Sequence, residues 1–301
     1  MITRRTALQL GALATAAAAL PLRAADAKLN TRKIPSSGEP LPLVGIGTAR
    51  RFDVNTPEER EPLMAVLQEL PRLGGKLVDT APSYGVAEVV VGELVAKIGN
   101  RKELFIATKV GAGRSGVEAG VAEMNQSLER LKKIDLMQIH NLNGVDVMLP
   151  VLRKWKEDGR IRYTGISTSN PKQYEQLETI MKNEPLDFIQ IDYAIDNRAA
   201  EDRILPLAAD RKIAVLTNLP FGRGRVLNAF QGKPVPEWAQ ELGIQTWAQF
   251  ALKWVVSHPA VTSAIPGTAK LEYLRDNLGA SRGPLPDAAT RRKMVELLAS
   301  A

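Results

Sequence analysis

Lys76-Leu77-Val78-Asp79-Thr80-Ala81-Pro82-Ser83-Tyr84-Gly85 is a short apolar run followed at once by a turn-forming segment. Two similar apolar runs come next along the chain, at 104–109 and 134–140, and the stretches between them carry helical spacing of apolar residues. Runs that are continuously apolar, rather than alternating, are expected for strands with both faces buried. The sequence therefore predicts strand–helix units whose strands are parallel.

The same alternation extends outward in both directions from this stretch. Predicted strands cover 43–47, 76–80, 104–108, 134–140, 162–167, 186–192, 212–218 and 261–266. Predicted helices cover 57–73, 88–98, 116–131, 146–158, 171–181, 202–210, 246–257 and 271–278, with a trailing helix at 287–299. Eight units at this spacing predict an α/β fold, a closed (β/α)8 TIM barrel with a single core. An open doubly wound sheet normally uses fewer strands and a switch point.

Four unlike polar residues follow three consecutive predicted strands: Asp79, Tyr84, Lys109 and His140. In a barrel, functional groups gather at the C-terminal ends of the strands, where these four residues lie. Taken singly, each has a structural explanation, such as a turn cap, an ion pair or a buried imidazole. A charge at the end of a buried strand is costly unless paired, however, and Asp79 and Lys109 are natural partners. Together the four groups can move a proton to or from a carbonyl oxygen, which is the chemistry of carbonyl reduction.

Residues 1–27 are predicted to be a cleavable export signal, leaving 28–301 as one barrel domain. Arg4 and Arg5 precede an apolar, alanine-rich stretch that is short for a membrane span, and Ala25-Asp26-Ala27 offers a cleavage site. The segment resembles a twin-arginine signal, and a general secretory signal or an uncleaved amphipathic helix are the alternatives. We expect a periplasmic protein with no stable membrane span after signal removal.

Composition excludes several classes of site. The 40 Lys+Arg against 33 Asp+Glu give a net charge of +7, but the excess is not clustered, which argues against a nucleic-acid partner and suits an anionic ligand. The chain has no cysteine, which rules out thiolate nucleophiles and cysteine metal sites. Its two histidines, His140 and His258, are far apart in sequence, so we expect no metal.

Gly111-Ala112-Gly113-Arg114-Ser115-Gly116 matches the spacing of a dinucleotide-binding loop between a strand and a helix. That motif requires an acid at the end of the next strand, and here the next strand ends in His140. We therefore interpret the segment as a flexible loop at the mouth of the barrel.

Several motifs between residue 43 and about residue 280 resemble, in order, those of the aldo-keto reductase superfamily. They are Asp79-Thr80-Ala81-x-x-Tyr84-Gly85, Ala107-Thr108-Lys109, Gln138-Ile139-His140, Gly159-Arg160-Ile161-Arg162-Tyr163-x-Gly165-Ile166-Ser167, Gln190-Ile191-Asp192-Tyr193 and Ile265-Pro266-Gly267-Thr268. The resemblance implies a barrel that binds NADP(H) in extended form without a Rossmann motif. It also implies an oxidoreductase that reduces small aldehydes or ketones to alcohols, and we expect a monomer.

The resemblance also implies roles for single residues. Tyr84 would be the general acid, Lys109 paired with Asp79 would assist it, and His140 would orient the carbonyl. Ser167 and Gln190 would hold the nicotinamide carboxamide. Further cofactor contacts are implied for the pyrophosphate loop Gly222, Arg223 and Gly224, for Gly267, Thr268 and Lys270 at the adenosine phosphate, and for Asn277 at the adenine.

Three positions depart from the family pattern. Thr168 stands where the family usually has Asn, Asn218 where an aromatic residue stacks on the nicotinamide, and Ala269 where an arginine binds the 2′-phosphate. Thr168 and Asn218 remain in our predicted cofactor site, and Lys270 or Arg275 would replace the arginine.

These departures bear on the choice between NADP and NAD, and they motivate an alternative, a non-catalytic NADP(H)-binding module that senses redox state. A barrel glycosidase is a weaker alternative, because it needs two facing carboxyl groups and Asp79 is the only acid in the predicted site. We expect the substrate walls to include 50–52 and 141–143.

Overall fold

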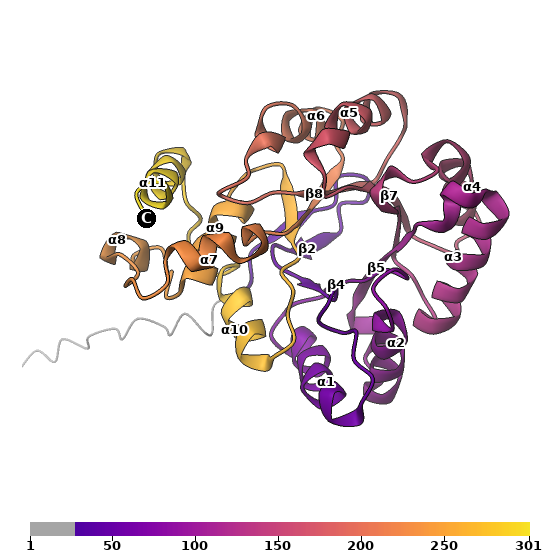
Figure 1. Cartoon of the computed structure of the whole chain (residues 1–301), viewed down its shortest axis with the longest axis horizontal. Helices are drawn as coiled ribbons and strands as arrows, with labels where there is room; N and C mark the ends of the chain where they lie inside the picture. The colour runs from indigo at the N-terminus through magenta and orange to yellow at the C-terminus, as the bar shows by residue number, and fades with distance from the viewer. Residues whose placement is uncertain (1–27) are drawn as a thin grey trace, which may run out of the picture.

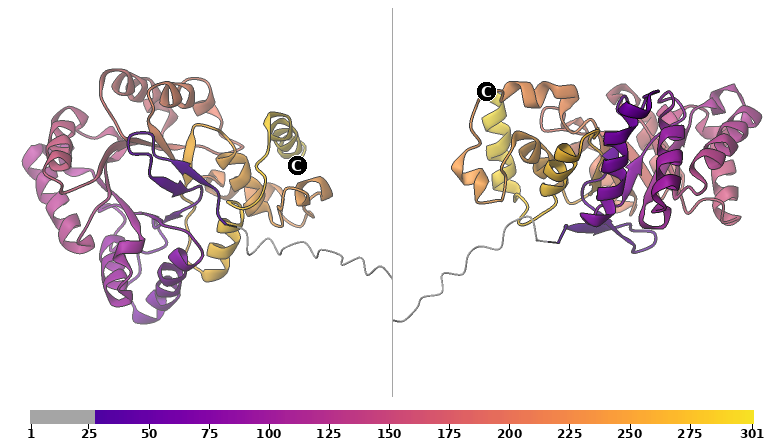
Figure 2. Two further views of the ribbon diagram at one scale, coloured as in Figure 1. Left: turned by 180° about the vertical axis from the view of Figure 1, so that it is seen from behind. Right: turned by 90° about the horizontal axis from the view of Figure 1, so that it is seen from below.

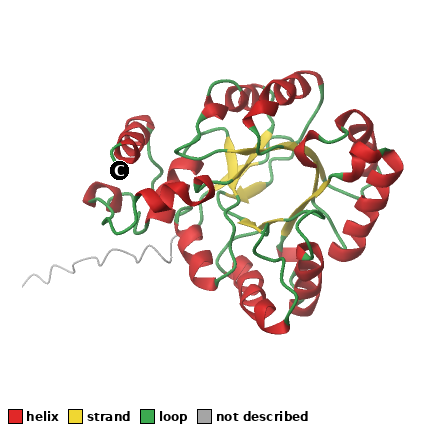
Figure 3. Ribbon diagram, viewed as in Figure 1, coloured by secondary structure: helices red, strands yellow, loops and turns green. Residues whose placement is uncertain are grey.

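The computed structural model describes residues 28–301, and the predicted export signal lies outside the described residues. Eight parallel strands form a barrel surrounded by helices (Figures 1 and 3). The strands are β3 (Ile46–Gly47), β4 (Leu77–Asp79), β5 (Phe105–Val110), β6 (Leu136–Ile139), β7 (Tyr163–Ser167), β8 (Phe188–Asp192), β9 (Ala214–Asn218) and β10 (Val261–Ala264). They pair in chain order, and the bridges Val44–Ala264 and Gly47–Gly267 join the last strand to the first. The predicted (β/α)8 barrel is confirmed.

Eight helices follow the eight strands around the barrel. They are α1 (Pro57–Arg72), α2 (Ala87–Ile98), α3 (Val117–Leu131), α4 (Val145–Glu157), α5 (Tyr174–Asn183), α6 (Ile204–Asp210), α9 (Trp247–Val256) and α10 (Leu271–Gly279). The short helices α7 (Arg225–Ala229) and α8 (Glu237–Gln240) and the C-terminal α11 (Ala288–Ala299) lie to one side of the barrel (Figures 1 and 2). No helix within residues 28–301 is long and apolar enough to cross a membrane.

Local sequence explains where several helices begin. At α1, the Thr56 hydroxyl accepts from the Glu59 N–H and the Glu59 carboxylate accepts from the Thr56 N–H, which forms a capping box before Pro57. The predicted helix 171–181 starts later than expected, because Pro171–Gln173 form a 3₁₀ turn and α5 begins at Tyr174.

The lower end of the barrel, where the strands begin, is closed by a hairpin that the sequence did not reveal. It consists of β1 (Thr31–Lys33) paired with β2 (Pro40–Pro42). Its apolar residues Ile34 and Leu41 are fully buried and belong to the same core cluster as the barrel residues Phe105, Tyr163 and Phe188. The interior at this end is therefore filled with side chains and leaves no channel.

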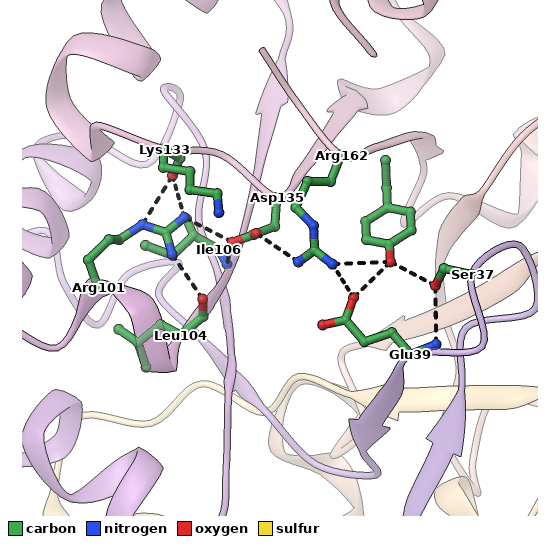
Figure 4. A network of polar contacts seen from close by, with 9 residues as sticks. Ser37, Glu39, Arg101, Leu104, Ile106, Lys133, Asp135 and Arg162 are labelled. Carbon is green, nitrogen blue, oxygen red and sulfur yellow. Dashed lines mark hydrogen bonds and ion pairs between the residues drawn. The ribbon is translucent and has the colours of Figure 1, made fainter. Parts of the chain in front are cut away.

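A polar network fastens this hairpin to the barrel (Figure 4). Asp135, which is buried, accepts from Arg101 at 2.9 Å and from Arg162 at 3.0 Å. Arg162 also pairs with Glu39 of the hairpin, and the Tyr163 hydroxyl lies 2.7 Å from a Glu39 carboxylate oxygen. The network holds the lower end shut and leaves the opposite end of the barrel for the site.

Candidate active site

The four predicted catalytic residues meet at the C-terminal ends of neighbouring strands. Asp79 ends β4, Lys109 is the penultimate residue of β5, His140 directly follows β6, and Tyr84 lies in the turn after β4. All four line one cavity of about 620 Å³. The structure thus brings together every member of the predicted acid–base set.

Asp79 and Lys109 form a buried ion pair. Lys109 Nζ donates to Asp79 Oδ2 at 2.7 Å and to the Thr80 carbonyl oxygen at 3.0 Å. Burial raises the pKa of Asp79, and the positive charge of Lys109 together with hydrogen bonds from Lys109, Gln138 and Gln190 opposes that rise. Burial lowers the pKa of Lys109, but the negative charge of Asp79 and the contribution of Tyr84 outweigh it, so the pKa of Lys109 lies above its ordinary value. Lys109 is therefore a permanent cation at neutral pH.

Tyr84 lies over this cation on a tight turn. The Tyr84 N–H donates to the Ala81 carbonyl oxygen at 3.1 Å, and Pro82 occupies the second position of the turn, where its fixed φ is favourable. Lys109 Nζ is 5.0 Å from the centroid of the Tyr84 ring. The phenol is thus presented to the cavity next to a charge that can stabilise its anion.

His140 completes the set from the neighbouring strand. Its ring meets the Tyr84 ring edge-on, with 5.9 Å between the centroids. Burial, and then the charge of Lys109, lower the pKa of His140 to about 4. The imidazole is neutral at neutral pH, so it can act as a hydrogen-bonding group rather than as a cation.

The turn after Tyr84 depends on Asp53, which sequence reasoning missed. The Val86 N–H donates to Asp53 Oδ1 at 3.0 Å. Gly85 has a φ of +62°, and a Cβ there would lie 2.0 Å from the Asp53 carboxylate. Only glycine fits both the backbone conformation and this close approach. The Gly85 in the motif was the available signal that something packs against the turn.

Three polar side chains from β7, β8 and β9 also line the cavity: Ser167 and Asn218, which end their strands, and Gln190, which lies in the middle of β8. Gln190 Oε1 and Asn218 Oδ1 are buried, and neither has a hydrogen-bond partner within the described part of the chain. Both residues line the cavity, so a small change of rotamer would offer their unpaired oxygens to a ligand that carries an N–H₂ donor. The residues present therefore fit a carboxamide group such as that of nicotinamide.

Comparison with known protein families identifies the family of this chain. The model of the Aldo/keto reductase family matches residues 43–292. The chain belongs to the aldo/keto reductase family.

Individual relatives agree with this assignment. An uncharacterised oxidoreductase of Schizosaccharomyces pombe is 30% identical over 242 residues, covering 75% of this chain and 76% of that protein. An aldo-keto reductase of the same yeast, whose name includes NADP(+), is 24% identical over 309 residues, covering 87% and 89% of the two chains. The chain thus spans most of the length of both relatives.

Solved structures show the same barrel. An aldo/keto reductase from Klebsiella pneumoniae, crystallised with NADP and acetate, is 25% identical with a TM-score of 0.73, covering 90% of this chain and 95% of the other. A Klebsiella pneumoniae aldo-keto reductase in complex with NADPH has 24% identity and a TM-score of 0.74, with the same coverage, which supports the fold.

The remaining predicted cofactor residues of this aldo/keto reductase divide into two groups. Thr168, Arg223, Gly224 and Gly267 line the cavity. Gly222, Thr268, Lys270 and Asn277 do not line it. Thr268 and Asn277 are both buried, and the Asn277 side-chain amide donates to Thr268 Oγ1 at 3.1 Å. Lys270 is exposed and lies 3.7 Å from a Glu272 carboxylate oxygen.

Thr168 has a different environment from the one expected. Its hydroxyl donates to Gln173 Oε1 at 2.5 Å and accepts from the Asn170 N–H at 3.0 Å. The side-chain amide of Gln173 in turn donates to the Asn141 carbonyl oxygen at 3.0 Å. The hydroxyl of Thr168 is therefore engaged in supporting the segment that follows His140.

The cavity walls agree in part with expectation. Arg50, Arg51 and Asn141 line the cavity, whereas Phe52, expected beside them, is fully buried in the core. Phe221 also lines it, three residues beyond Asn218. Sequence reasoning missed this aromatic residue because it lies beyond the end of the strand, and the available signal was its place in the loop directly before Gly222.

The glycine-rich segment at 111–116 takes no part in the cavity. The N–H groups of Gly111 and Ala112 donate to the Glu123 carboxylate of α3 at 2.6 and 2.9 Å. A carboxylate thus occupies the donors that a phosphate would need. Across residues 28–301, no group of three or more acidic or histidine side chains could hold a metal ion.

Proposed function

We propose that this aldo/keto reductase reduces aldehydes or ketones to alcohols with NADPH, using Tyr84 as the general acid. The observation that carries the proposal is the buried Asp79–Lys109 pair beside Tyr84 and His140 in one cavity. The family member from Klebsiella pneumoniae that was crystallised with NADP supports the choice of cofactor.

The chain has groups suited to both ends of the cofactor. Ser167, Gln190 and Asn218, which line the cavity, would hold the nicotinamide carboxamide by hydrogen bonds. Arg223 carries positive charge to the cavity and has no ion-pair partner among the described residues, so it would attract the phosphates. When bound, NADPH supplies the hydride that reduces the carbonyl carbon.

The residues of the chain handle the proton. The Tyr84 hydroxyl donates its proton to the carbonyl oxygen as negative charge develops there. The Lys109 ammonium stabilises the phenolate that remains, and Asp79 holds Lys109 in place through a buried ion pair. The neutral His140 ring offers a hydrogen bond to the same oxygen, which orients the carbonyl.

The test compares wild type with Tyr84→Phe for NADPH consumption across a panel of aldehydes and ketones. Positioned acid–base catalysis is worth about 10²–10⁴-fold, so we expect a loss of that size in turnover while NADPH binding, followed by fluorescence, is kept. Tyr273→Phe is the matched control, since Tyr273 is 50% exposed and does not line the cavity. Unchanged turnover in Tyr84→Phe would disprove its role. Tight NADPH binding by wild type without turnover would favour the redox-sensing alternative.

We also propose that residues 1–27 direct export to the periplasm by the twin-arginine route, which carries folded proteins with their cofactors. The support is the Arg4-Arg5 pair, the apolar stretch and the Ala25-Asp26-Ala27 site. Replacing both arginines by lysine should trap the unprocessed protein in the cytoplasm, and wild-type protein should begin near Lys28. N-terminal sequencing of the protein in the periplasmic fraction tests this proposal. If the variant with both arginines replaced were found there in processed form, the twin-arginine route would be excluded.

A further inference from the structure

Ser83, the residue before the proposed general acid, contacts the His140 ring. Ser83 Oγ lies 3.2 Å from His140 Nδ1, and this is the only hydrogen-bond partner of that hydroxyl among residues 28–301. Ser83 occupies the third position of the turn that presents Tyr84, so its place is fixed by the same Pro82-containing turn. One short segment thus supplies both the phenol and a contact to the imidazole.

The contact leaves the other ring nitrogen of His140 free. No described residue forms a hydrogen bond with His140 Nε2, and His140 lines the cavity. The groups facing the ring are the Tyr84 ring, the Lys109 ammonium and the Ser83 hydroxyl. None of these groups is a carboxylate, which would stabilise a second proton on the ring. The imidazole is neutral near pH 7 and carries a single N–H.

The position of that single hydrogen decides what His140 can do. With the hydrogen on Nε2, the ring donates to a carbonyl oxygen in the cavity. With the hydrogen on Nδ1, a lone pair on Nε2 would face the same oxygen and repel it. The hydrogen bond at one ring nitrogen sets which nitrogen is protonated, so the partner at Nδ1 controls the group presented at Nε2.

We propose that Ser83 is a positioning residue that donates its hydroxyl hydrogen to His140 Nδ1 and thereby keeps the ring hydrogen on Nε2, facing the substrate. The proposal rests on the proposed carbonyl reduction. A hydroxyl can donate or accept, but only donation is compatible with a carbonyl oxygen that accepts from Nε2. The substrate oxygen and Ser83 thus favour the same tautomer from opposite sides of the ring.

Ser83→Ala removes the donor and retains the fold of the turn, because the turn is held by main-chain bonds and Pro82. We expect kcat/KM for carbonyl reduction to fall about three- to tenfold, the effect of one neutral hydrogen bond. Ser83→Thr keeps the hydroxyl and should restore most of the loss. In a His140→Gln background, Ser83→Ala should have no further effect, because its action passes through His140.

The tautomer can be measured without turnover by ¹⁵N NMR of the imidazole nitrogens, since the chain has only two histidines. We expect protonated Nε2 on His140 in wild type near pH 7, and a population of protonated Nδ1 in Ser83→Ala. His258 is an internal control, because its Nδ1 accepts from the Ala260 N–H at 3.2 Å and should not change.

Protonated Nδ1 on His140 in wild type, or an unchanged tautomer in Ser83→Ala, would overturn the proposal. The NMR result decides the role of Ser83 at His140 even if the protein reduces no carbonyl. A failure of the proposed function and a failure of this inference are therefore distinguishable.

Discussion

Replacing Lys109 by methionine would leave the Asp79 carboxylate buried without its cation. The side chains of Lys109 and Asp79 are 1% and 3% exposed, and 2.7 Å separates Nζ from Oδ2. Removing one partner of a buried ion pair costs about 3–5 kcal/mol, because the remaining charge has neither water nor a counter-ion. We expect the free energy of unfolding of Lys109→Met to be lower than that of wild type by about this amount near pH 8.

The loss should depend on pH with a defined sign. Burial raises the pKa of Asp79 even in the presence of Lys109, and the rise must be larger without that cation. A raised folded-state pKa contributes stability that is present below the unfolded value near 3.9 and is lost as the pH rises through the folded value. The penalty in Lys109→Met should therefore shrink as the pH falls, with a limiting slope of about 1.4 kcal/mol per pH unit.

The matched control is the double variant Asp79→Asn/Lys109→Met, which removes both charges at similar volume. Urea unfolding, followed by tryptophan fluorescence, gives the free energy of unfolding of each variant between about pH 4 and pH 8. The difference between the single and double variants isolates Asp79, because all other titrating groups are shared. The double variant should recover most of the lost stability near pH 8. A difference that does not change with pH, or a double variant no more stable than the single one, would refute this reasoning.

Two other predictions concern the segment after His140 and the buried Lys253, whose Nζ donates to the Arg282 and Pro284 carbonyl oxygens at 2.6 and 2.8 Å. Gln173→Ala removes the hydrogen bond to the Asn141 carbonyl oxygen, so it should speed amide hydrogen exchange at Asn143, whose N–H donates to the His140 carbonyl oxygen at 3.1 Å. The control Gln176→Ala changes an exposed residue and should leave this exchange rate unchanged. Equal exchange rates at Asn143 in the two variants would contradict the prediction. Burial lowers the pKa of Lys253 from 10.5 to about 8. Between pH 8 and pH 10.5 the unfolded chain therefore binds a proton at Lys253 that the folded chain does not bind. The free energy of unfolding of wild type, relative to that of Lys253→Met, should therefore rise with pH across this range. A pH-independent difference in denaturant unfolding would contradict the second prediction.

The barrel, and the meeting of Asp79, Lys109 and His140 at one cavity, could be predicted because both leave signals within a few residues. Continuous apolar runs mark strands buried on both faces, and their regular order leaves one closed arrangement. Asp79, Lys109 and His140 stand out because each is a polar residue where an apolar run stops. Their convergence follows from the parallel order of the strands, so no knowledge of side-chain rotamers was needed.

The hairpin β1–β2 could not be predicted for the opposite reason. Each of its strands has only three residues, too few to show a period. Its place is set by partners far along the chain, such as Glu39 with Arg162 and Tyr163. Contacts of this kind depend on the completed barrel, which brings residues more than a hundred positions apart into reach.

Thr168 shows why site residues are harder to assign than strand ends. The sequence predicts Thr168 to be a cofactor residue, although the family usually has asparagine at this position, and in the structure it does line the cavity. Its hydroxyl, however, is engaged with Gln173, which holds the Asn141 carbonyl next to His140, where Asn141 has a φ of 54°. Asparagine tolerates this left-handed backbone better than most residues, but Leu142 after it also has a φ of 56°, which costs energy unless the surroundings hold the segment. The threonine at a predicted cofactor position therefore supplies a hydrogen bond that supports the segment after His140, and this role becomes visible only when the path of that segment is known.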